Sequence, residues 1–189
     1  DQLADVLDRA TLRTYHGCRT DDAGSYFREG LLVHDRAHMT ARLRSIVEQN
    51  QELNWFAPRL DAAIAEIDNT LDIGRLYVVA EDTFLLKHAA HYLIYGSEWI
   101  AAVLGAPTLL EIDLPLRVAT PGTLRELSAK LLAEWTRRAC NQPDWHAPID
   151  FSFCLRTDIP PDWIVDHSHP AELNDPLEQR RLYKAAVAG

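Results

Sequence analysis

The feature of this sequence that most constrains its fold is the irregular order in which strand-like and helix-like segments follow one another. Strand-length runs that are apolar or alternate between apolar and polar residues lie at 11–17, 75–80, 108–114 and 149–156, with helical periodicity between them. A doubly wound parallel sheet needs a helix after each strand, and these segments do not keep that rhythm. The sequence therefore predicts an α+β domain with a mixed or antiparallel split sheet and flanking helices.

Two amphipathic stripes fall between the first and second predicted strands. Each spaces its apolar residues three or four apart, the first with Met39, Leu43, Ile46 and Val47 and the second with Leu60, Ile64, Ile67 and Leu71. They predict an antiparallel helical pair inserted at about 36–71. No Gly/Ser linker divides the 189 residues, so a single domain over 1–189 is expected.

Capping signals mark the other predicted helices. A short helix after the first strand is expected to end at Gly30, a long one to begin at the cap Asp82 and bend at Gly96, and another to begin at the cap Thr120. The tail from 173 onward is interpreted as a docking helix. These elements would flank the sheet.

Composition excludes several functional classes. The formal net charge of −9 argues against a broad electrostatic grip on duplex nucleic acid. No run of 18 apolar residues is present, so membrane insertion is not expected. The three cysteines are too scattered for a disulfide framework or a CxxC zinc site, which favours a reduced, cytoplasmic setting.

Common catalytic signatures are missing from the sequence, since GxxxxGK[ST], GxGxxG and GxSxG do not occur. His88 and His91 are three residues apart on a predicted helix, and Glu98 lies about two turns further on, which leaves a zinc site as an alternative. Cys18 is interpreted as a structural thiol on the strand face opposite His16. The His167-Ser168-His169 run is interpreted as a polar turn.

Two short clusters carry the strongest functional signal. The first is "YHG" at 15–17, followed by a short helix and "GL" at 30–31; the second is "GRLYVVAED", whose Tyr77 precedes a helix containing Tyr92. This order resembles the ADP-ribosyltransferase superfamily, in particular its His-Tyr-Glu (PARP-like) branch. The resemblance spans residues 12–95 and continues loosely through the later strands.

The resemblance implies roles for particular residues in binding NAD⁺. His16 would hydrogen-bond a ribose hydroxyl, and the backbone of Gly17 would hold the nicotinamide amide. Tyr77 would stack on the nicotinamide ring, with Tyr92 as a second wall. Apart from the resemblance, Arg19 is expected near the pyrophosphate, because a guanidinium suits phosphate oxygens.

The sequence departs from the family pattern at its glutamate. The resemblance implies a glutamate at the start of the strand at 149–156, but that segment offers only Asp150. Glu98 is the candidate that replaces it, and Glu111 is expected on the solvent face of its strand. The predicted catalytic set is therefore Glu98, His16 and Tyr77, with a carboxylate to stabilise an oxocarbenium-like centre.

The resulting hypothesis is NAD⁺-dependent transfer of ADP-ribose to a protein or nucleic-acid acceptor, with release of nicotinamide, as in a bacterial toxin or defence effector. An antitoxin or immunity partner would fit such a role, and neither a metal cofactor nor a membrane partner is expected. Three alternatives stay open. They are an NAD⁺-dependent RNA 2′-phosphotransferase with Arg19 and His91 in a basic site, a metal-dependent hydrolase using His88, His91 and Glu98, and a catalytically inactive binding module of the same fold.

Overall fold

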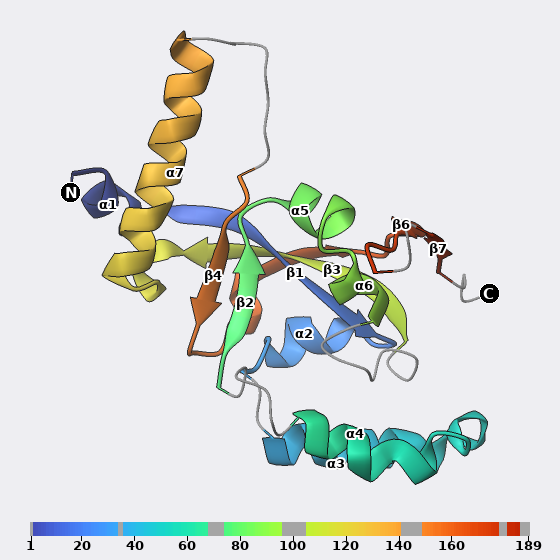
Figure 1. Cartoon of the computed structure of the whole chain (residues 1–189). Coiled ribbons are helices and arrows are strands. Elements are labelled where there is room, and N and C mark those ends of the chain that lie inside the picture. The colour runs from blue at the N-terminus through green and yellow to red at the C-terminus, as the bar shows by residue number, and fades with distance from the viewer. Residues whose placement is uncertain are drawn as a thin grey trace.

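A five-stranded sheet organises the chain, as the computed structural model shows for residues 2–33, 36–67, 74–95, 105–140, 149–177 and 181–185. The strand order is β4-β2-β1-β3-β5, and every pair of neighbours is antiparallel. The expected α+β class with an antiparallel sheet is confirmed (Figure 1). The strands are β1 (Thr11–Thr20), β2 (Leu76–Val79), β3 (Ala106–Pro115), β4 (Ser152–Leu155) and β5 (Ile164–Ser168).

The centre of the sheet is the long ladder between β1 and β3. It runs without a register shift from Thr11↔Pro115 to Thr20↔Ala106. β1 therefore continues past Gly17, where the sequence pattern predicted its end. Each residue from 18 to 20 finds a partner on β3, so tertiary pairing extends the strand beyond its local alternation.

Helices and a small hairpin cover the two faces of the sheet with separate apolar clusters. The first cluster packs α7 (Pro121–Cys140), α1 (Gln2–Leu7) and α2 (Gly24–Glu29) on one face. The second lies on the other face under α5 (Asp82–Lys87), α6 (His91–Tyr95) and the hairpin of β6 (Glu172–Asn174) and β7 (Leu182–Lys184). Residues of β1 with odd numbers, such as Tyr15, face the second cluster, and even-numbered ones such as Leu12 and Cys18 face the first.

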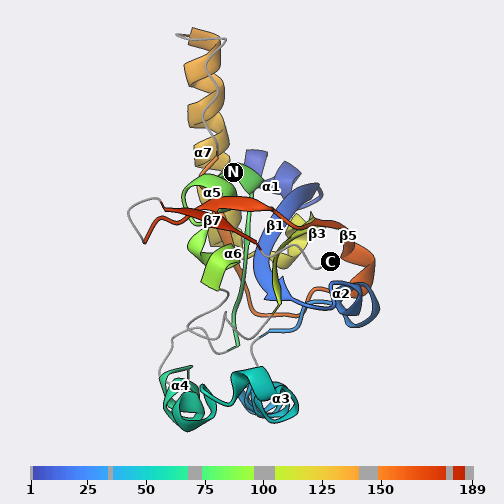
Figure 2. The same cartoon turned by 90° about the vertical axis from the view of Figure 1, so that its right-hand side faces the viewer.

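The predicted helical pair is present as α3 (Arg36–Gln49) and α4 (Leu60–Ile67), and residues 68–71 lie outside the described range. Its apolar residues form a third cluster of their own. Figures 1 and 2 both show the pair standing away from the sheet. The stripe residues Leu43, Ile46, Val47, Leu60 and Ile64 thus pack together within the insertion.

Two local predictions were wrong. The long helix expected from Asp82 is broken at His88–Ala90 into α5 and α6, because the chain turns there to bury Ala89 and Ala90. The C-terminal tail forms the β6–β7 hairpin rather than a docking helix, with Leu173 buried in the second cluster. The bend expected at Gly96 lies outside the described residues.

Other boundary signals were right. The hydroxyl of Thr120 accepts a hydrogen bond from the Thr123 amide at 3.2 Å, which caps α7 as predicted. Helix α2 ends at Gly30. A residue with a side chain is disfavoured there because φ is 83° and because a Cβ would lie 2.3 Å from the carbonyl oxygen of Ile159. α1 was not predicted. Short 3₁₀ turns complete the fold: η1 (Gln51–Leu53), η2 (Ala57–Arg59), η4 (Leu116–Val118) and η5 (Pro161–Trp163). Within the described ranges, every helix is too short or too polar to span a bilayer.

Candidate functional site

The most distinctive feature of the sheet is the point where β1 and β2 separate. The two strands pair at Tyr15↔Val79. The same register would next bring Gly17 opposite Tyr77, but no pair of these described residues forms there. We call the region bounded by Gly17, His16 and Tyr77 the β1–β2 split.

The backbone polar groups of Gly17 and Tyr77 point into this split. The Leu116 amide donates to the Ala10 carbonyl, so by antiparallel alternation the even residues of β1 bond to β3 and the amide and carbonyl of Gly17 point toward β2. The Ala80 amide donates to the Phe151 carbonyl, which by the same rule turns the peptide groups of Tyr77 toward β1.

The His16 side chain bridges the two strands at the split. Its Nδ1 lies 2.8 Å from the carbonyl oxygen of Tyr77, and because a carbonyl only accepts, Nδ1 carries the proton. This bond replaces part of the missing ladder and fixes the orientation of the ring. In the neutral imidazole, Nε2 is then a hydrogen-bond acceptor.

Tyr77 is exposed rather than part of a core. Its neighbours Leu76 and Val78 are buried in the first cluster, while Tyr77 points to the other face with 40% of its surface exposed. Cys154 of β4 lies directly opposite it in register and is also exposed. The structure therefore offers an accessible aromatic ring beside the split.

The glycine at position 17 has a structural reason. A Cβ at this position would lie 3.2 Å from Leu93 and 3.4 Å from Leu85, which pack onto β1 from α6 and α5. The predicted second wall, Tyr92, comes from the same helix α6, is 48% exposed and stacks against His91 with ring centroids 4.2 Å apart. The element that carries Tyr92 thus covers the strand next to the split.

The side chain of Arg19 links β1 to three other segments of the chain. Its guanidinium donates to the carbonyl of Ile94 at 2.7 Å, to the hydroxyl of Tyr183 at 3.0 Å and to the carbonyl of Gly105. These bonds tie β1 to the end of α6, to the segment before β3 and to the hairpin. The sequence analysis expected the Arg19 guanidinium near a pyrophosphate. Because these hydrogen bonds engage the guanidinium, its position does not support that prediction.

The structure describes two of the three carboxylates that the sequence analysis considered, Glu111 and Asp150. Glu98 lies outside the described residues. Glu111 is partly exposed and bonds Arg13 at 2.6 Å. On β4 the side chains that share the face of Tyr77 are Ser152 and Cys154, preceded by the exposed Asp150. The position of a catalytic carboxylate therefore stays a prediction.

The proposed zinc ligands do not share one helix. The break between α5 and α6 separates His88 from His91, which removes the spacing argument, and no group of three or more metal-ligating side chains occurs in the described ranges. Burial lowers the pKa of His91, while Asp175 opposes that shift. His167 and His169 lie at the end of β5 in contact with each other, not in a turn.

The expected orientation of Cys18 was wrong. Because β1 continues to Thr20, residues 16 and 18 project to the same side of the strand, and Cys18 packs against the first cluster. This packing agrees with the structural role that the sequence analysis gave to the Cys18 thiol.

Cys154, which lies directly opposite Tyr77, was missed by the sequence analysis as a candidate site residue. The alternation in "FSFCLR" could have identified it, since every second residue of that run is buried.

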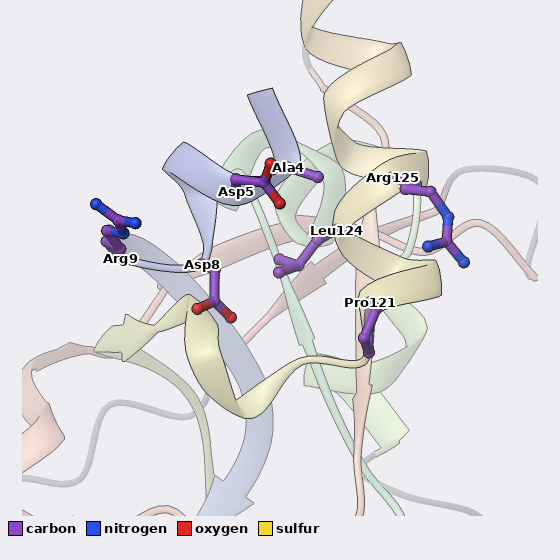
Figure 3. Close-up of a pocket in the computed structure, with 7 residues that line it drawn as sticks. All are labelled: Ala4, Asp5, Asp8, Arg9, Pro121, Leu124 and Arg125. Carbon is purple, nitrogen blue, oxygen red and sulfur yellow. The ribbon is translucent and has the colours of Figure 1, made fainter. Parts of the chain in front are cut away.

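A separate pocket of about 390 Å³ lies between α1 and the first turns of α7. It is lined by Ala4, Asp5, Asp8, Arg9, Pro121, Leu124 and Arg125. Figure 3 shows the Arg9 and Arg125 guanidinium groups turned outward, away from one another. None of the predicted site residues lines this pocket.

Comparison of the chain with family models, with curated proteins and with solved structures finds no match in any of the three.

Proposed function

We propose that this protein binds NAD⁺ at the β1–β2 split and transfers its ADP-ribose to a macromolecular acceptor, releasing nicotinamide. The observation that carries the proposal is the His16 Nδ1–Tyr77 carbonyl bond at 2.8 Å, which bridges β1 and β2 at the split, where the peptide groups of Gly17 and Tyr77 face one another without pairing. The motif residues that suggested the ADP-ribosyltransferase resemblance thus come from two strands that meet at one point.

The groups at the split suit the parts of the cofactor, with His16 on the first-cluster face of the sheet and the Tyr77 ring on the other face. A carboxamide needs one donor and one acceptor, which the amide and carbonyl of Gly17 supply in a fixed direction. The acceptor Nε2 of His16 suits a ribose hydroxyl. The exposed ring of Tyr77 offers a face for the flat, cationic nicotinamide, and Tyr92 is the candidate for its other wall.

The proposed reaction breaks the bond between ribose C1′ and the nicotinamide nitrogen. Nicotinamide leaves with both electrons of that bond, and the acceptor's nucleophile bonds to C1′ and gives up its proton. The developing oxocarbenium charge needs a nearby carboxylate. Glu98 is the residue proposed for this step, as the sequence suggested. Asp150, which precedes β4 and lies within the described residues, is the alternative.

A catalytically inactive NAD⁺-binding module is the second candidate. It is favoured by β4, where Ser152 and Cys154 occupy the positions beside Tyr77 and no glutamate is present within the strand. Such a module would bind the cofactor through the same groups without turnover.

Thiol protection tests binding directly. Cys154 and Cys140 are both exposed, but only Cys154 lies opposite Tyr77, and Cys140 ends α7. We expect saturating NAD⁺ to slow alkylation of Cys154 and to leave Cys140 unchanged, as followed by peptide mass spectrometry. Equal rates with and without NAD⁺ at both thiols would refute binding at the split.

Nicotinamide release, measured by chromatography with cell extract and with RNA, then separates the candidates. Release that disappears in His16→Ala supports the transferase, and release only with an RNA that bears a 2′-phosphate supports a phosphotransferase. Protection of Cys154 without release in any mixture supports the inactive module.

A further inference from the structure

The five-stranded sheet ends on one side at β5. Among the strands that the structure describes, β5 is last in the order and pairs with β3 alone. Peptide groups on the outer edge of such a strand form a template on which another strand can pair. The state of these groups therefore determines whether β5 can associate with a further chain.

The peptide amide of His167 points to this outer edge. The even-numbered residues of β1 bond to β3, so Leu110, which lies opposite His16, directs its own peptide groups toward β1. His167 is the residue of β5 opposite Leu110, and its amide and carbonyl consequently face away from β3. The amide donates instead to the carboxylate of Asp166 at 2.7 Å. A side chain of β5 thus occupies the donor that an added strand would need.

Other features of β5 also oppose pairing at this edge. The Ile164 amide donates to the carbonyl of Pro161. A register shift against β3 leaves Val165 as an extra residue, which is a β-bulge. Pro170, two residues after the strand, has no N–H to donate. The Asp166 bond is the contribution of one side chain, so a single substitution can remove it.

The surroundings of the edge suit a second copy of the same strand. Val165 is 40% exposed, and Phe27 of α2 packs its ring edge-on against the His167 ring, with centroids 5.5 Å apart. Two β5 strands that meet antiparallel about a two-fold axis at His167 would exchange the amide and carbonyl of that residue. The same register places Asp166 opposite Ser168, so no like charges face each other.

We propose that the outer edge of β5 is a pairing surface for a second copy of this chain, and that the Asp166 carboxylate keeps this surface closed. Removing the carboxylate frees the His167 amide and also removes a charge that pairing would bury at a cost. The inference goes beyond the proposed function and does not depend on it, since β1 and β3 separate β5 from β2.

Sedimentation velocity of the full chain over a range of concentrations tests the proposal. We expect Asp166→Ala to self-associate about tenfold more tightly than the wild type and to reach twice the wild-type mass. Asp166→Asn keeps an oxygen that can accept the His167 amide, so it should associate less than Asp166→Ala. Asp162→Ala is the matched control, because it removes an exposed carboxylate from the turn before β5 and should keep the wild-type mass.

A second substitution locates the contact. Adding Val165→Lys to Asp166→Ala should restore the wild-type mass, since a lysine on an edge strand opposes pairing. A double variant that stays associated would place the contact elsewhere and overturn the proposal. Association of Asp162→Ala equal to that of Asp166→Ala would attribute the effect to net charge and overturn it as well.

Circular dichroism checks that each variant folds. Asp166→Val is the second uncapped variant if Asp166→Ala does not fold, because valine suits a strand. A folded, uncapped variant that keeps the wild-type mass at every concentration would show that Asp166 does not close the edge.

Discussion

The two edges of β1 are used in opposite ways. On one edge, ten consecutive residues pair with β3 in a single register from Thr11 to Thr20. On the other edge the strand pairs with β2 at Tyr15 and then separates, and the imidazole of His16 reaches across to the Tyr77 carbonyl. One strand thus provides both the most regular part of the sheet and the most irregular.

This difference separates stability from function within one element. Along the paired edge, many side chains of β1 and β3 are fully buried in the core. At the split, peptide groups and the exposed Tyr77 ring lie where a ligand could reach them. We therefore expect mutations along the β3 edge to change mainly the free energy of unfolding. Mutations at the split should change mainly ligand binding.

The largest effect is expected for Ile112→Ala on β3. Ile112 is completely buried in the first cluster, so the loss of its side chain should lower the free energy of unfolding by about 2–5 kcal/mol. Urea denaturation measures the change. Val165→Ala on β5, where the side chain is 40% exposed, is the matched control and should change stability by less than about 0.5 kcal/mol. Equal losses in the two variants would contradict the assignment of the core.

Arg19→Gln should have the next largest effect, a loss of about 1.5–3 kcal/mol, because it removes charge-assisted bonds to the Ile94 carbonyl and the Tyr183 hydroxyl. Amide hydrogen exchange should rise in α6 and the β6–β7 hairpin. A variant with wild-type stability but weaker NAD⁺ binding would instead restore Arg19 to the cofactor site.

Gly17→Ala tests the packing of α6 over the split. The added methyl group would meet Leu93 at 3.2 Å, a flexible side chain that can yield, so we expect destabilisation of about 1 kcal/mol. Gly122→Ala on α7 has its nearest neighbour at 3.6 Å and should not be destabilising. If both alanines were tolerated equally in thermal unfolding, close approach of α6 would not be the reason for the glycine.

A smaller effect is expected from the pH dependence of stability at His91. Burial lowers its pKa in the folded state, so the unfolded chain takes up a proton at higher pH than the folded one. This contribution is fully present above about pH 6.5 and is lost as the pH falls from there toward the lowered folded pKa. Denaturation curves of His91→Gln should therefore decline less between neutral and mildly acidic pH than those of the wild type.

The smallest effect is expected for Arg13→Gln on the paired edge. Arg13 bonds Asp113 at 2.7 Å and Glu111 at 2.6 Å, and both carboxylates raise the pKa of its guanidinium. The group is solvent-exposed, so screening leaves little net stabilisation. We expect near wild-type thermal stability at high salt and a slight decrease at low salt. A large loss at high salt would show that these ion pairs matter more than their exposure suggests.

The sequence predicted those features whose signal is local. Apolar or alternating runs located β1, β2, β3 and β4, apolar spacing located the α3–α4 pair, and the Thr120 cap and the Gly30 stop marked helix ends. Each of these depends on residues within a few positions of one another. The two short motifs "YHG" and "GRLYVVAED" marked His16, Gly17 and Tyr77 as candidates.

Only the tertiary structure decided where pairing continues and where it stops. β1 runs on to Thr20 because β3, almost a hundred residues later, offers a partner to each residue, and it leaves β2 after Tyr15 although both strands continue. The same long-range packing broke the helix at His88–Ala90 and brought Tyr77 opposite Cys154. Propensity and periodicity are properties of residues that are neighbours in the sequence. Strand partners, register and the end of a ladder depend instead on contacts between distant segments, which no local window of sequence contains.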